Sequence, residues 1–149
     1  MKACIVSDSH DRAAALDAAV AIAKAEGAEV VIHCGDVIGA NTLRPLVRHG
    51  LPVHVVHGNN LGDPGAFARI GAATGGLVHY HGADAELALA GRRVVATHYP
   101  HYGGRRRDTP CTWNHAGACL RLHRPAAQLG HWMPAGGRPS SKYAGGKSS

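Results

Sequence analysis

Five side chains that commonly bind metal ions follow short apolar segments in the first two-thirds of this 149-residue chain. They are Asp8, His10, Asp36, Asn59 and His98. In open α/β sheets the functional groups lie at the carboxyl ends of the strands, so we expect these side chains to lie near one point. Carboxylates, an amide oxygen and imidazoles suit Mn, Fe or Zn better than Ca alone. The pattern therefore predicts a transition-metal site.

Polar residues at strand ends have a second common role, which is to cap a helix or to form a turn. We assign that role to Asp11, Asn41 and Asp63. For any single member of the set the two roles are comparable alternatives. The metal site is favoured because the ends of four strands each carry a ligand. Gly35 and Gly58 also stand directly before two of the five residues, where they permit a close approach of the backbone.

The elements that must position these residues are marked by apolar runs and by capping residues. Strands are predicted for six segments: Lys2 to Ser7, Glu29 to His33, Pro52 to His57, Leu77 to His81, Ala85 to Ala90 and Arg92 to Thr97. Helices are predicted from Asp11 to Gly27, over Asn41 to His49, and from Asp63 to Gly75. Strands that alternate with helices imply a parallel sheet with helices on both faces. The last two strands are expected to pair as a hairpin through Gly91. The fold class is α/β.

The net charge of +6 is distributed unevenly along the chain. Residues 1–102 contain 8 Lys+Arg and 9 Asp+Glu, a balance of −1, whereas residues 103–149 contain 8 Lys+Arg and one acid, a balance of +7. The first part has 12 Val and 5 Ile, and the second has neither. No apolar run approaches the ~20 residues of a membrane-spanning helix, so we expect no membrane association. The four cysteines show no compact disulfide pattern, which predicts a reducing, cytoplasmic location.

The strand-end motifs resemble those of the calcineurin-like metallophosphoesterases, and the short length resembles their small prokaryotic phosphodiesterase branch. The motifs are Asp8-x-His10, Gly35-Asp36, Gly58-Asn59 and the histidine of Thr97-His98-Tyr99-Pro100. The resemblance covers residues 1–102 and implies a two-sheet sandwich flanked by helices. It implies that Asp36 bridges two metal ions, that Asp8 and His10 bind the first, and that Asn59 and His98 bind the second. Asp36, Asn59 and His98 are accordingly the expected catalytic residues.

The resemblance also implies the chemistry and the cofactors. We expect two divalent ions, with Mn preferred and Fe, Zn or Ni as alternatives, to hold a bridging hydroxide that attacks phosphorus. The expected activity is hydrolysis of a small phosphodiester or of a nucleotide-like substrate. Many relatives have a histidine after the Gly-Asn pair that assists the leaving group, and here Asn60 occupies that position.

One motif of the family is missing from the sequence. A Gly-His-x-His segment should follow the His98 strand and supply one more ligand to each metal, and the nearest fragment is Gly130-His131-Trp132-Met133. We therefore expect weaker metal binding, reduced turnover and an incomplete second sheet. The chain divides into a metallophosphoesterase domain, residues 1–102, and an atypical basic tail, residues 103–149, which we expect to be poorly ordered. Our hypothesis is that the reading frame slips near Gly103, and the alternative is a genuine basic tail.

Two functions of other classes remain as alternatives. The first is a non-catalytic interaction protein on the same scaffold, as in the retromer subunit that shares this fold. The second is a nucleic-acid binder that uses the basic tail, which we disfavour because a charge run such as Arg105-Arg106-Arg107 is more often simply solvated. Thr112 to His123 is a candidate helix. Cys111, His115, Cys119 and His123 recur at intervals of four, which on a helix would line one face, but a zinc site there is disfavoured because Pro110 and Gly117 weaken such a helix. The oligomeric state is left open.

Overall fold

The computed structural model of the chain describes residues 1–99, 111–113 and 119–122. Its elements in chain order are β1 (Lys2–Val6), α1 (Ala13–Ala25), β2 (Ala28–Cys34), the 3₁₀ helix η1 (Ala40–His49), β3 (Val53–Val56), α2 (Pro64–Ala73), β4 (Val78–Tyr80), β5 (Asp84–Leu89), β6 (Arg92–Thr97), β7 (Cys111–Trp113) and β8 (Cys119–Leu122). The six strands and three helices predicted within the first 102 residues are all present. Their ends differ from the predicted ones by a few residues at most.

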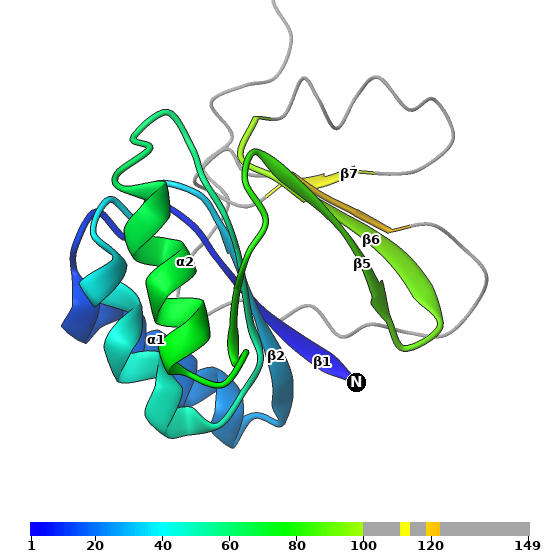
Figure 1. Ribbon diagram of the computed structural model, residues 1–149. Helices are drawn as coiled ribbons and strands as arrows, with labels where there is room; N and C mark the ends of the chain where they lie inside the picture. The colour runs from blue at the N-terminus through cyan, green and yellow to red at the C-terminus, as the bar shows by residue number, and fades with distance from the viewer. Residues whose placement is uncertain (100–110, 114–118, 123–149) are drawn as a thin grey trace, which may run out of the picture.

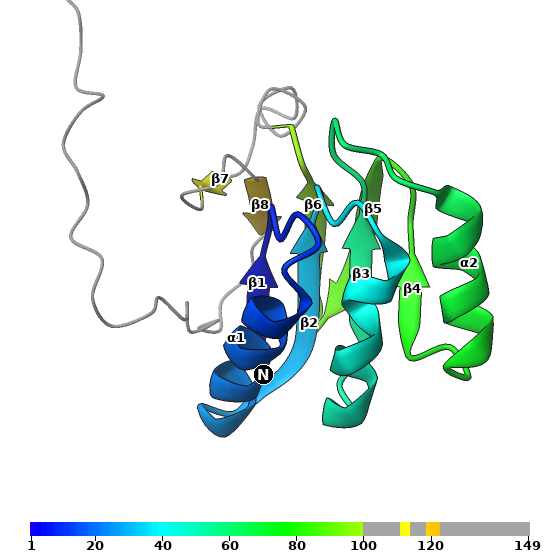
Figure 2. The same cartoon turned by 90° about the vertical axis from the view of Figure 1, so that its left-hand side faces the viewer.

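The strands form two sheets, as Figures 1 and 2 show. One sheet has the order β1-β2-β3-β4 and all its pairings are parallel. The other has the order β5-β6-β8-β7 and all its pairings are antiparallel. The expected α/β class with two sheets is confirmed. No helix in the described part of the chain is both long enough and apolar enough to cross a membrane.

The parallel sheet lies between a layer of helices and the antiparallel sheet (Figure 1). On one face, Leu16 and Val20 of α1, Leu43 of η1 and Phe67 of α2 pack with sheet residues such as Val31. On the other face, a second apolar cluster joins the two sheets: Ile32, Cys34, Val56, Ala85, Leu87, Val94 and Ala96. The expectation of helices on both faces is therefore wrong for the described residues. The apolar run of β2 indicates that both faces of the parallel sheet are covered. It does not indicate whether helices or a second sheet cover each face.

Asp11 does not cap the helix that follows it. Helix α1 has Arg12 at its N-cap position, without a side-chain capping bond. The Oδ1 atom of Asp11 instead accepts hydrogen bonds from the backbone N–H of Gly39 at 2.6 Å and from Thr42 Oγ1 at 2.9 Å. Gly39 is the N-cap residue of η1, and Thr42 lies in its first turn. The prediction that Asp11 caps the helix after it is therefore wrong, because its carboxylate contacts the start of η1 instead.

The other two capping assignments have different outcomes. Asp63 is the N-cap of α2, accepts a hydrogen bond from the Gly65 N–H at 2.9 Å and is followed by a proline at the first helical position, as predicted. Asn41 lies inside η1, and its Oδ1 atom accepts a hydrogen bond from Arg44 Nε at 2.7 Å.

The hairpin between β5 and β6 is confirmed, and Leu89 pairs with Arg92. The two residues between them, Ala90 and Gly91, have φ angles of 50° and 72°. A two-residue loop with both φ angles positive is the type I′ turn, which matches the twist of the flanking strands. Gly91 adopts this conformation readily, whereas Ala90 adopts it at a steric cost.

Two short strands lie beyond residue 103, where a helix from Thr112 to His123 was considered. Strand β8 pairs with β6 and with β7, and Trp113 lies opposite Cys119. Within the described residues this segment is therefore strand, and Cys111 and Cys119 do not lie on the face of a helix. The strand signal in the sequence is weak, because the segment has no Val or Ile and only Thr112 and Trp113 favour a strand. His115, His123, the Arg105–Arg107 run and the expected disorder of the tail lie outside the described residues.

Candidate metal centre

Two loops, one after β1 and one after β2, are joined by backbone hydrogen bonds that continue past the ends of the strands. The N–H of Asp8 donates to the Gly35 carbonyl at 2.9 Å, and the N–H of His10 donates to the Asp36 carbonyl at 3.0 Å. A third bond joins Asp11 N–H to the Val37 carbonyl at 3.2 Å. The position of Asp8 and His10 relative to Asp36 is thus set by main-chain contacts.

The three residues also share a left-handed backbone conformation. Their φ angles are 55° at Asp8, 42° at His10 and 55° at Asp36. Such a conformation costs roughly 1–2 kcal/mol for a residue with a Cβ atom and persists only where the surroundings enforce it. The backbone bonds between the two loops supply that constraint. Strained residues held in this way are frequent at binding and catalytic sites.

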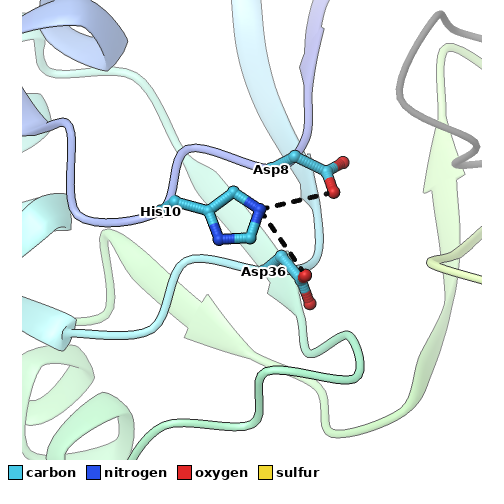
Figure 3. Close-up of side chains that lie close together, drawn as sticks. All are labelled: Asp8, His10 and Asp36. Atoms are coloured by element: carbon cyan, nitrogen blue, oxygen red, sulfur yellow. Dashed lines mark ion pairs between the residues drawn. The ribbon is translucent and has the colours of Figure 1, made fainter.

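The side chains of Asp8, His10 and Asp36 point toward one another, as Figure 3 shows. His10 Nε2 lies 3.7 Å from Asp8 Oδ1 and 3.7 Å from Asp36 Oδ2. One ligand atom from each residue lies within 4.8 Å of the other two, and among the described residues no other set of three or more His, Cys, Asp and Glu side chains does so. The Asp36 side chain is 3% exposed, whereas those of Asp8 and His10 are 29% and 41% exposed. The group can therefore be reached from solvent on the side of Asp8 and His10.

Asp36 is the most buried of the three and has the most hydrogen bonds. Asn60 donates to it twice, from its backbone N–H to Oδ1 at 3.0 Å and from Nδ2 to Oδ2 at 2.6 Å. Burial by itself would raise the pKa of Asp36, but the Asn60 bonds and the nearby imidazoles of His98 and His10 outweigh it and hold the pKa below the ordinary value. Asp36 is therefore a carboxylate at neutral pH.

His98 joins the group through its Nε2 atom, which lies 3.7 Å from Asp36 Oδ1 and 3.1 Å from Asn59 Oδ1. Its Nδ1 atom lies 2.8 Å from the Cys34 carbonyl oxygen. Because a carbonyl only accepts hydrogen bonds, the proton of the neutral ring must be on Nδ1, and Nε2 carries a lone pair. In that tautomer the Nε2 lone pair, the Asn59 amide oxygen and the Asp36 carboxylate face one another. That arrangement fits a bound cation.

Two glycines permit this close packing. A Cβ atom on Gly35 would lie 2.6 Å from Nδ1 of His98, and one on Gly58 would lie 2.8 Å from the His98 ring and would also clash with the Asp36 carboxylate. Gly35 has in addition a φ of 105°, which a side chain would disfavour. The expectation that these glycines allow close approach is confirmed.

The five sequence-predicted residues thus meet at one edge of the parallel sheet, and sequence reasoning missed several groups that support them. Buried His33 accepts a hydrogen bond from the Gly35 N–H at its Nδ1 atom, at 3.3 Å, and so donates from Nε2 to Ser9 Oγ at 3.0 Å. Ser7 Oγ donates to Asp8 Oδ2. His57, directly before Gly58, contacts the Tyr80 hydroxyl at 2.6 Å rather than the ligand group. In the sequence, Ser7, Ser9 and His33 are marked only by lying within a few residues of the candidate ligands.

The chain is similar to known proteins in its sequence and in its fold. The family model of the calcineurin-like phosphoesterase superfamily domain matches residues 1–125, further than the 1–102 covered by the sequence motifs. A solved structure described as that of a novel archaeal phosphodiesterase has a TM-score of 0.57 and 22% identity to the chain, which establishes similarity of fold. The similarity covers 62% of this chain and 56% of that one, so the chain spans little more than half of its length. Comparison with curated proteins gave no match. From the family match and the fold, the chain belongs to the calcineurin-like phosphoesterase superfamily.

Proposed function

We propose that the chain hydrolyses a small phosphodiester or a nucleotide-like ester and that it requires two divalent metal ions. The observation that carries the proposal is the position of Asp36, whose two oxygens face two different imidazoles. Oδ2 lies 3.7 Å from His10 Nε2, and Oδ1 lies 3.7 Å from His98 Nε2. A carboxylate between two separate sets of donors is suited to contact two cations at once.

In this proposal Asp8 and His10 hold the first ion, Asn59 and His98 hold the second, and Asp36 contacts both. Bound divalent ions would neutralise charge on the phosphoryl oxygens and lower the pKa of a water molecule. We keep Mn as the preferred ion, with Fe, Zn and Ni as alternatives, since each accepts mixed carboxylate and imidazole ligands.

The residues of the chain hold the site in a fixed arrangement before substrate arrives. The Cys34 carbonyl fixes the ring of His98, and Asn60 fixes both oxygens of Asp36. Because the Asn60 amide donates to Asp36, and because an amide does not titrate near neutral pH, Asn60 is unsuited to protonate a leaving group. We infer that turnover is fastest for esters whose leaving group departs without a proton, such as a nitrophenolate.

The partly exposed side chains of Asp8 and His10 border the site on its solvent side, where a small substrate can approach. We place the protein in the cytoplasm, which agrees with the unpaired thiols of the buried residues Cys4 and Cys34. The expected reduction in metal affinity and turnover, from the missing Gly-His-x-His motif, remains part of the proposal.

The test is hydrolysis of bis-p-nitrophenyl phosphate by the full chain with and without Mn²⁺. We expect a Mn²⁺-dependent rate that falls by about 100-fold or more in Asp36→Ala, equivalent to roughly 3 kcal/mol of transition-state stabilisation. The matched control is Glu29→Gln, which removes an exposed carboxylate at the opposite end of β2 and should leave the rate unchanged. Equal rates in wild type and Asp36→Ala would contradict the proposed activity.

Metal content gives a second measurement. After dialysis with Mn²⁺, we expect up to two ions per wild-type chain and fewer in Asp36→Ala, because that substitution removes a ligand from both positions. Stoichiometric binding without hydrolysis would instead favour a non-catalytic protein on this scaffold.

A further inference from the structure

A second group of potential metal ligands lies away from the candidate centre, on strands β3 and β4. Val53 and Val55 of β3, and Val78 and Tyr80 of β4, pack in the cluster beneath the helices. Side chains alternate along a strand, so the histidines between and after these residues project from the opposite face. They are His54, His79 and His81. Strands β3 and β4 lie side by side, and β4 is the edge strand of the parallel sheet (Figure 2).

The three rings are in mutual contact. His54 lies opposite His79 in the strand register, and their rings stack with centroids 4.9 Å apart. His54 Nδ1 lies 2.9 Å from His81 Nε2, and the centroids of those two rings are 5.2 Å apart. His54 is half-buried, whereas His79 and His81 are exposed. An ion could therefore reach the group from solvent.

The environment of His54 and His81 favours the neutral imidazole, which is the form that binds metal ions. Burial and the neighbouring histidines lower the pKa of His54 to about 4, and burial together with His79 lowers that of His81. A neutral imidazole offers one unprotonated nitrogen, and its single proton can move to the other ring nitrogen without any net release.

We propose that His54 and His81 form a surface site for Ni²⁺ or Cu²⁺, with His79 as a third ligand after rotation of its exposed side chain. Two nitrogens at adjacent corners of a square-planar site, each ~2.05 Å from the ion, lie about 2.9 Å apart. The separation between His54 Nδ1 and His81 Nε2 has that value. One of these nitrogens donates a hydrogen bond to the other. When an ion binds to one side of the line between them, that proton would move to the other nitrogen of its own ring, and both rings would turn so that their lone pairs face the ion.

This site does not depend on the proposed phosphodiesterase activity. None of its histidines is among the five residues of the candidate metal centre, and the test below can succeed or fail whatever the outcome of the hydrolysis assay.

The test is equilibrium dialysis of Ni²⁺ against the full chain, the variant His81→Ala and the double variant His54→Ala/His81→Ala. We expect wild type to bind one more equivalent than the double variant, and His81→Ala to bind that equivalent at least about tenfold more weakly. The control is His49→Gln, which removes a histidine on η1 that contacts Asp17 and should leave the stoichiometry unchanged. Repeating the series in an Asp8→Ala background separates this ion from those of the candidate centre.

The position of the bound ion on the protein provides an independent readout. Substoichiometric Cu²⁺ added to the ¹⁵N-labelled full chain should first broaden the amide signals of residues 53–56 and 78–81. Equal Ni²⁺ stoichiometry in wild type and the double variant would overturn the proposal. So would early broadening that is confined to the loops around Asp8 and Asp36. Because His81 is exposed, its single variant should fold even where the double variant does not, and circular dichroism checks this.

Discussion

The stability of the protein should fall steeply as the pH decreases from 6.5 to 4, and buried His33 is the reason. His33 is fully buried, and burial lowers its pKa from 6.5 to about 4 even though nearby Asp36 acts in the opposite direction. The unfolded chain takes up a proton at His33 near pH 6.5, and the folded chain does so only near pH 4. Between these values the unfolded state binds more protons, so the free energy of unfolding rises with pH and is lost on acidification.

The magnitude follows from the difference in pKa. One pKa unit corresponds to 1.36 kcal/mol, so a difference of about 2.5 units gives about 3 kcal/mol of stability. That contribution is complete above pH 6.5 and absent below pH 4. It is a large share of the ~5–15 kcal/mol that stabilises a typical domain. His33 accepts a hydrogen bond from Gly35 N–H and donates one to Ser9, so protonation would also break the Gly35 bond next to the candidate metal centre.

The variant His33→Asn isolates this effect. Its amide oxygen can replace Nδ1 as acceptor for the Gly35 N–H, but an amide does not titrate. Urea unfolding of both proteins in EDTA, followed by far-ultraviolet circular dichroism between pH 4 and 8, gives the two stability profiles. We expect His33→Asn to be less stable at pH 8, and its profile to be flatter than that of wild type by about 3 kcal/mol over this range. Contributions from the other carboxyls and histidines are common to both proteins. Parallel profiles would refute the assignment of His33 as a buried neutral residue.

Three further predictions concern single residues. Ala90→Asn should raise the free energy of unfolding by about 0.5–1 kcal/mol, measured in urea, because asparagine tolerates the positive φ of the type I′ turn better than alanine; a destabilised variant would contradict that turn. Gly58→Ala should weaken Mn²⁺ binding by at least about tenfold in calorimetric titration, since its methyl group would meet the His98 ring, and unchanged affinity would show that the site relaxes easily. Cys34, whose thiol pKa burial raises to about 12, should escape iodoacetamide at pH 8 in the native protein and react only after unfolding, as peptide mass mapping can show.

Much of the parallel sheet could be predicted because its signals are local. A strand buried on both faces needs an unbroken apolar run, and the polar residue that stops the run marks the strand end. For this reason Asp8, Asp36 and Asn59 were found from the sequence, and they lie together at one sheet edge. The glycine positions followed from the same reasoning, because a backbone that approaches a ligand closely leaves no room for a side chain.

What could not be predicted depends on contacts between distant parts of the chain. Asp11 is adjacent to α1 in sequence, but the Gly39 N–H and the Thr42 hydroxyl that donate to it lie at the start of η1. Strands β7 and β8 lack valine and isoleucine, and they are defined by their pairing: β8 pairs with β6, and β7 pairs with β8. The two hydrogen bonds from Asn60 to Asp36 likewise arise only when the loops after β2 and β3 come together.

The backbone bonds between the loops after β1 and β2 have a consequence for how the family can diversify. Asp8, His10 and Asp11 each bond to a successive position on the partner loop, so a residue inserted in one loop would shift every later pairing. An insertion or deletion in one of these two loops should therefore persist only together with a matching change in the other. Asn59 and His98 come from separate segments outside this paired register. Insertions should therefore be tolerated less in the loops that carry Asp8, His10 and Asp36 than in the segments that carry Asn59 and His98.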